Sequence, residues 1–186
     1  MTDATSALQE PLLWLDPLMV WVPVAWLATM FTLAGLSKLS DRYLFVQHLG
    51  AYRTPDALLP TMTWAIPIAE LLTAGLLLSP WRQWGAVCAA ALLLAYATGM
   101  AWHLHQGRSL DCGCGGEALP LSWHLVARNT LLALLAVPAA ASTLERDIAS
   151  ADRWVIAAAL VLAALLSLAF HQVLRHRQHG LTSRLA

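Results

Sequence analysis

Residues 62–104 read MTWAIPIAELLTAGLLLSPWRQWGAVCAAALLLAYATGMAWHL, and this stretch decides the fold. Two apolar runs, residues 62–78 and 84–104, flank the segment SPWRQ, which is too short for anything but a turn. Each run has about the length that an α-helix needs to cross roughly 30 Å of hydrocarbon. Neither run alternates as a barrel strand does, and helices and closed barrels are the two structures that satisfy the backbone in lipid. The stretch therefore predicts an antiparallel pair of transmembrane helices.

Similar apolar runs occur elsewhere in the chain, at residues 18–36, 121–141 and 154–173. Hydrophobic residues make up 59% of the sequence and charged residues 12%, which lies outside the range of ordinary soluble domains. Tryptophans stand near most ends of the runs, as expected at the headgroup level of a bilayer. We predict an all-α, polytopic membrane helical bundle of about five transmembrane helices. It comprises an N-terminal tail (1–17), a transmembrane domain (18–174) and a basic C-terminal tail (175–186).

The charge pattern excludes several function classes. Eleven basic and eleven acidic side chains balance, so no basic stripe is available to neutralise a phosphate backbone, and we expect no nucleic-acid partner. The chain also contains no nucleophile elbow, phosphate-binding glycine loop or zinc-protease helix. Its partner is the lipid bilayer, and its chemistry must come from the few polar residues.

Three charged residues are predicted to lie at a similar depth in the membrane, because successive spans run in opposite directions. Lys38 ends the first span, Glu70 lies about two turns into the second, and Arg128 lies about two turns into the fourth. A charge at the centre of a membrane helix costs about 2.5–3.5 kcal/mol, so such residues usually pair. We predict that Glu70 pairs with Arg128, either to lock two helices together or to shape a site under the following loop. Lys38 is expected to extend its ammonium to the interface.

The same membrane face holds the most polar internal loop, LHQGRSLDCGCGGEALPLSW (104–123). Cys112 and Cys114 are separated by one glycine, so a disulfide between them would close a tight, strained ring. Strain raises the reduction potential, which suits exchange with client thiols rather than permanent crosslinking. We predict that Cys112 and Cys114 form the catalytic dithiol. Cys88, among alanines inside the third span, is expected to be a small core residue.

Metal binding is the competing interpretation of this loop. His103, His105 and His124 lie near the two cysteines, and thiolate with imidazole suits Cu(I) or Zn(II). No pair has the gap of two to four residues that is usual in closed zinc sites, and His103 and His105 point in different directions on a helix. We therefore predict no metal site. No bound cofactor is predicted either, and the motifs do not identify an electron carrier, whether a quinone or another molecule.

Several motifs together resemble one family. They are Gly35-Leu36-Ser37-Lys38, Glu70, Asp111-Cys112-Gly113-Cys114-Gly115 and Arg128-Asn129, within residues 26–140. This pattern resembles the MauE family of methylamine utilisation proteins, related in pattern to DoxX-like membrane proteins. Gly116 departs from it, since relatives often carry an aromatic residue there. That departure affects the local packing of the loop.

The resemblance implies a role in maturing the β (small) subunit of methylamine dehydrogenase, a periplasmic protein rich in disulfides, beside the thioredoxin-like partner MauD. The expected activity is thiol–disulfide exchange at Cys112 and Cys114, supported by Lys38, Glu70 and Arg128. Two alternatives stay open: a non-catalytic membrane assembly or export factor, and a soft-metal transporter.

The expected location is the cell inner membrane. Basic residues favour a cytoplasmic C-terminus, and with five spans the cysteine loop lies on the same side. A periplasmic client favours the opposite side. The charge pattern and a periplasmic client are compatible if the protein passes electrons across the bilayer, or if the glycine-rich loop enters the protein interior.

Overall fold

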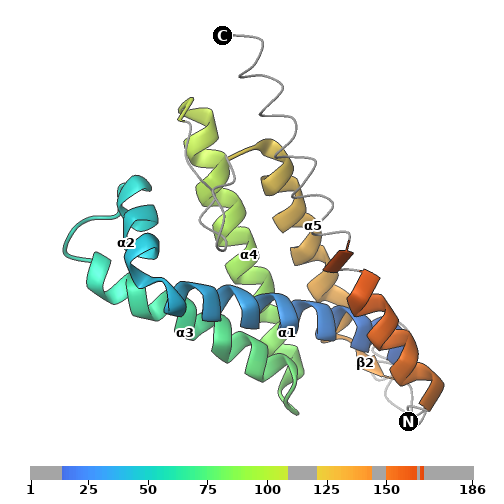
Figure 1. Cartoon of the computed structure of the whole chain (residues 1–186). Coiled ribbons are helices and arrows are strands. Elements are labelled where there is room, and N and C mark those ends of the chain that lie inside the picture. Colours follow the sequence, from blue (N-terminus) through green and yellow to red (C-terminus); the bar gives the residue numbers. More distant parts are fainter. Residues whose placement is uncertain (1–13, 109–120, 144–149, 163, 166–186) are drawn as a thin grey trace, which may run out of the picture.

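The computed structural model describes residues 14–108, 121–143, 150–162 and 164–165 (Figure 1). Five helices dominate: α1 (Pro17–Ser40), α2 (Arg42–Ala51), α3 (Leu59–Leu77), α4 (Arg82–His105) and α5 (Trp123–Ala140). Two very short strands, β1 (Trp14–Leu15) and β2 (Ser142–Thr143), pair in parallel. Residues 150–162 and 164–165 are also helical.

The predicted helical membrane bundle is confirmed. Three of the helices, α1, α4 and α5, are long and apolar enough to cross a membrane. α3 is also long, at 19 residues, but Glu70, Pro60 and Pro67 lower its hydropathy. The first four predicted spans coincide with α1, α3, α4 and α5. The fifth is helical at residues 154–162 and 164–165, and its other residues, 163 and 166–173, lie outside the described residues.

The predicted hairpin joins α3 to α4 through a turn in which the Ser79 side chain accepts a hydrogen bond from the Trp81 amide. Gly85 stands where the two helices touch. A Cβ on this residue would lie 2.5 Å from the backbone nitrogen of Leu77, so a side chain cannot be accommodated without moving backbone. The close contact sets the angle at which α4 leaves the turn.

The short helix α2 was not predicted, because residues 42–51 contain no apolar run long enough to cross a membrane. Its start is capped by Asp41, whose carboxylate accepts a hydrogen bond from the Leu44 amide at 3.0 Å. Phe45 is its buried residue, and the Arg42 guanidinium lies 4.8 Å from the centre of the Trp64 ring on α3. A cap and one aromatic anchor are thus enough to fold a segment that has no long apolar run.

The core is built from side chains of α1, α3, α4 and α5, with α1 packed against α3 and α5, and α4 packed against α3 and α5. α1 contributes large side chains, among them Leu27 and Phe31, and α4 and α5 contribute mostly alanines, such as Ala89 and Ala136. Small residues let helix backbones approach closely, which is how helices pack inside membranes. Large apolar residues cover the outside instead, including Met19, Leu33, Leu72, Trp84, Trp102, Leu131 and Val137. This apolar outer surface is the one expected to face lipid.

Candidate functional site

A buried ion pair joins the last turn of α1 to α3. The Lys38 ammonium lies 2.8 Å and 3.0 Å from the two carboxylate oxygens of Glu70. Glu70 is 0% exposed and Lys38 is 8% exposed. The Tyr96 hydroxyl of α4 donates a further hydrogen bond of 2.7 Å to Oε1 of Glu70. One carboxylate therefore connects three helices.

Gly35 explains how the two charged residues reach each other. It lies one turn before Lys38 on α1, and a Cβ there would be 2.9 Å from Cγ of Leu71 and 3.1 Å from the carbonyl oxygen of Pro67. The absence of a side chain lets α1 pack directly on α3. The motif Gly35-Leu36-Ser37-Lys38 thus contains both the contact that brings the helices together and the cation that pairs across them.

The predicted ion pair between Glu70 and Arg128 is wrong, as is the expectation that Lys38 extends to the interface. Within the part of the chain that the structure describes, Glu70 is paired with Lys38. The physical reason is proximity in low dielectric: a lysine one turn beyond a close helix contact gains more by neutralising a buried carboxylate than by reaching water. The positions of Lys38 and Glu70 within their predicted spans place them at the same depth in the membrane. These positions do not show that α1 and α3 touch there.

The predicted convergence of Lys38, Glu70 and Arg128 is confirmed, because all three line one cavity of about 230 Å³. Asn129, 2% exposed on α5, lines it too. The Nε atom of Arg128 is buried and has no hydrogen-bond partner among the described residues. Sequence reasoning grouped these residues correctly, and erred in how they pair.

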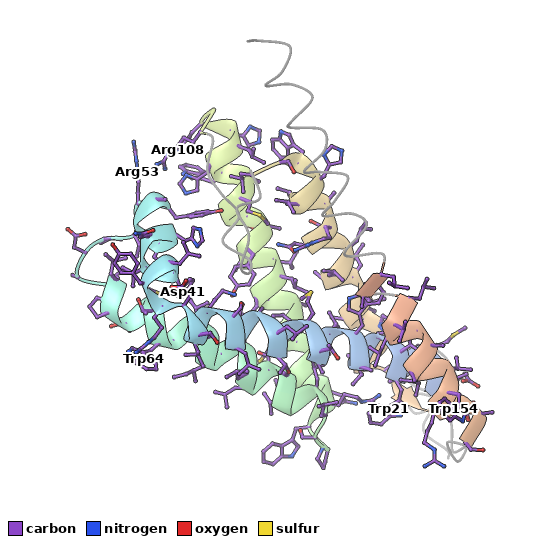
Figure 2. All side chains as sticks on the ribbon, in the orientation of Figure 1. Trp21, Asp41, Arg53, Trp64, Arg108 and Trp154 are labelled. Atoms are coloured by element: carbon purple, nitrogen blue, oxygen red, sulfur yellow. The ribbon has the colours of Figure 1, made fainter. Side chains whose placement is uncertain are left out.

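A second polar cluster lies at the C-terminus of α4. His103 is buried, and the Tyr52 ring packs edge-on against it at 4.9 Å between ring centres. Arg108 donates to Nδ1 of His103 at 2.9 Å and to the Ala51 carbonyl at 3.0 Å. Because a guanidinium can only donate, Nδ1 is the acceptor, and a neutral His103 carries its proton on Nε2. Figure 2 shows Arg53 and Arg108 at this end and Trp21 and Trp154 at the other.

Gly107 allows this cluster to form. Its φ of +66° is in the left-handed region that glycine adopts most readily, and it turns the chain back after α4. The Arg108 amide then bonds to the His103 carbonyl at 3.2 Å. His103 was considered as a metal ligand, and the structure gives it an arginine neighbour.

Cys112 and Cys114 lie outside the described residues, with Asp111, Gly115 and Gly116. The residues on either side of the segment that contains them are described. The rings of His105, ending α4, and Trp123, starting α5, are 5.0 Å apart and meet edge to face. Leu121 is buried in a cluster with Met100 and Leu125. The segment therefore begins and ends at the end of the bundle that carries α2 and His103.

Two other predicted features are described in part. Cys88 is free and half-buried on α4, so it is less enclosed than a core position. Within the described ranges, no three His, Cys, Asp or Glu residues are grouped so that they could hold a metal ion.

The family model described as "Methylamine utilisation protein MauE" matches residues 16–144. The chain belongs to this family. It is 37% identical to methylamine utilization protein MauE of Paracoccus denitrificans over 128 residues, which cover 66% of this chain and 69% of the relative. It is 36% identical to the protein of the same name from Paracoccus versutus over 131 residues, covering 68% and 70%. No solved structure matches.

The matched MauE range contains both the buried network and the cysteine segment. Lys38, Glu70, Tyr96 and Arg128 all fall within residues 16–144, as does the connection from α4 to α5. This MauE-family protein is thus a multi-pass membrane protein with a buried charged network, and the ends of α4 and α5 flank its Cys-Gly-Cys segment. Within this network, the hydrogen bonds of Glu70 to Lys38 and Tyr96 tie α1, α3 and α4 together.

Proposed function

We propose that this protein is an integral inner-membrane factor for maturation of the methylamine dehydrogenase β subunit, acting by thiol–disulfide exchange at Cys112 and Cys114. The observation that carries the proposal is membership of the methylamine utilisation family over a range that includes the Cys-Gly-Cys segment. The described residues on either side support it, since the segment joins the C-terminus of α4 to the N-terminus of α5, where the rings of His105 and Trp123 are in contact.

The proposed chemistry moves two electrons from client to membrane protein. A client thiolate attacks one sulfur of the Cys112–Cys114 disulfide, forms a mixed disulfide and releases the other cysteine as a thiolate. A second client thiolate then attacks the mixed disulfide, which leaves a client disulfide and two reduced cysteines. The client loses two electrons and two protons, and the cysteine pair gains them.

Lys38, Glu70 and Arg128 act as positioning residues in this proposal. The Lys38–Glu70 pair fixes α1 against α3, and Tyr96 ties α4, which leads into the cysteine segment. Arg128 lies on α5, which follows that segment. Reoxidation of the cysteine pair requires an electron acceptor. The thioredoxin-like MauD is the proposed partner in the same maturation process.

Trapping the mixed disulfide tests the proposal. Each single variant keeps one cysteine of the pair, Cys112 in Cys114→Ser and Cys114 in Cys112→Ser. This cysteine is first converted to a mixed disulfide with thionitrobenzoate, so that a client thiolate has a disulfide to attack and releases thionitrobenzoate as it forms the crosslink. We expect one of the two variants to accumulate a crosslink to the β subunit that dithiothreitol dissolves, with Cys88→Ser as the matched control that forms none. Normal maturation in both single variants, with no trapped species, would instead support the non-catalytic assembly factor. Copper or zinc copurifying with the protein, and lost from the Cys112→Ser variant, would support soft-metal transport.

A further inference from the structure

The cavity beside the ion pair has the size and lining of a binding site for a small ring compound. Its volume is about 230 Å³, and an apolar protein cavity of about 150 Å³ is already enough to hold benzene. Side chains that pack well on a flat ring line it, namely Met30, Phe31, Phe45, Tyr52, Tyr96 and Met100. Ala95, also on the lining, is exposed on α4, so the cavity reaches the surface of the bundle within a membrane-spanning helix.

The polar groups of the cavity select for a ligand that accepts hydrogen bonds. Lys38 and Arg128 supply two cations against one anion, Glu70, and the buried Nε–H of Arg128 has no acceptor among the described residues. A buried donor without an acceptor is costly, and a ligand carbonyl would remove that cost. His48 and Asn129 offer further polar contacts. A ligand carboxylate would also accept a hydrogen bond from Arg128, so a fatty acid serves as the competitor in the test below.

We propose that this cavity binds the head group of a lipid-soluble quinone, with a ring carbonyl accepting from Arg128. The ring lies among the aromatic and methionine side chains, and the apolar tail leaves through the opening at Ala95. The redox sense of the inference rests on the proposed function: two thiols give up two electrons and two protons to become a disulfide, and the quinone takes up both to become a hydroquinone. Binding itself does not depend on the cysteines.

Gly99 provides a variant that fills the cavity without disturbing the fold. It lines the cavity, and a Cβ there would have no heavy atom within 4 Å. Gly75 on α3 is equally open, is exposed on the surface and is not part of the lining. Leucine favours the helix over glycine at both positions, so Gly99→Leu and Gly75→Leu form a matched pair that differs in occupying the cavity.

The experiment measures equilibrium binding of ubiquinone-1 to the full-length protein in nanodiscs, with empty nanodiscs as the partition control. We expect saturable binding at one site per chain, unchanged in Gly75→Leu and weakened at least about tenfold in Gly99→Leu. Arg128→Met should also weaken it about tenfold through loss of one charged hydrogen bond. Palmitate should not displace the quinone.

Several results would overturn the inference: uptake no greater than in empty nanodiscs, wild-type affinity in Gly99→Leu, or displacement by palmitate at stoichiometric concentration, which would make the occupant a lipid carboxylate. The Cys112→Ser/Cys114→Ser protein separates the two proposals. It should bind quinone as the wild type does. If the wild-type protein binds quinone but shows no thiol exchange, the proposed function is wrong and the cavity assignment stands. If it shows thiol exchange but binds no quinone, the cavity assignment is wrong and the proposed function stands.

Discussion

Glu70 is the side chain through which the polar groups of the buried site are connected. It accepts hydrogen bonds from Lys38 and Tyr96 and is fully buried. A buried ion pair need not stabilise a protein relative to apolar residues, but removing one partner leaves an uncompensated charge, which typically costs about 3–5 kcal/mol. The network is therefore far more sensitive to single substitutions than to paired ones.

A double-mutant cycle tests which cation is the partner of Glu70. We expect Glu70→Gln and Lys38→Met each to lower the melting temperature of the purified protein sharply, and the double variant to be less damaged than the sum of the two. The cycle of Glu70→Gln with Arg128→Gln should show a smaller coupling. A larger coupling with Arg128 than with Lys38 would restore the pairing that the sequence suggested.

The Tyr96 hydroxyl can be tested with a more conservative change. Tyr96→Phe removes one hydrogen bond to a charged group and keeps the ring, so we expect a loss of about 1.5–3 kcal/mol in stability. Tyr43→Phe is the control, because Tyr43 is 78% exposed and its hydroxyl lies outside the network. Equal melting temperatures for Tyr96→Phe and the wild type would show that the bond to Glu70 contributes nothing.

Which residues share the site could be predicted from the sequence, whereas their pairing could not. Span depth places Lys38, Glu70 and Arg128 at one level, and they do line one cavity. Pairing depends on which helices touch, and Gly35 decides that through a contact with Leu71 and Pro67 that no spacing rule contains. Tyr96 was missed because a tyrosine in an apolar span is ordinary until a carboxylate is found beside it.

Among the helices, those with long apolar runs could be predicted from the sequence, and the one that depends on local and tertiary contacts could not. Long apolar runs predicted α1, α3, α4 and α5, because a segment that crosses lipid must be both long and apolar. α2 has neither property. It depends on a cap at Asp41 and on the burial of Phe45 against its neighbours, which are local and tertiary effects that an apolar-run search does not detect.

The turn between α3 and α4 gives a prediction for the hairpin. Alanine is normally better than glycine in a helix by about 1 kcal/mol, so Gly75→Ala, on an open surface, should be neutral or stabilising. Gly85→Ala should instead destabilise the protein by about 1–3 kcal/mol, since its Cβ would meet the backbone of Leu77 at 2.5 Å. The test compares the thermal unfolding of both variants with that of the wild type in the same detergent. Equal stability would mean that the helices separate there at no cost.

For the molecule as a whole, the two ends of the bundle differ in charge. Arg42, Arg53 and Arg108 belong to the end that carries α2 and the C-terminus of α4. Arg82 and Arg153 lie at the other end, where Arg82 donates to the Ala141 carbonyl at 2.8 Å and Arg153 precedes Trp154. Basic residues concentrate on the cytoplasmic side of membrane proteins. This asymmetry favours the cytoplasmic side for the end that carries the cysteine segment, whereas direct exchange with a periplasmic client requires that segment to be reached from the other side.

Sidedness can be tested at exposed residues of the described ends. In a background free of the native cysteines, Gln83→Cys reports on the α3–α4 turn and Asp56→Cys on the connection between α2 and α3. We expect a membrane-impermeant maleimide to label Gln83→Cys in intact cells and Asp56→Cys after lysis. The opposite pattern would place the cysteine end outside, and would leave the proposed thiol chemistry standing.

The most direct measurement of the central claim is the thiol state of the methylamine dehydrogenase β subunit in cells that carry the Cys112→Ser/Cys114→Ser protein. Acid quenching followed by a mass-tagged maleimide counts its free thiols, with immunoblotting of the membrane protein to confirm equal accumulation and Cys88→Ser cells as the control. The account predicts that free thiols accumulate on the β subunit and dehydrogenase activity is lost in the double variant, but not in the control. A fully oxidised β subunit with wild-type activity in the double variant would contradict it.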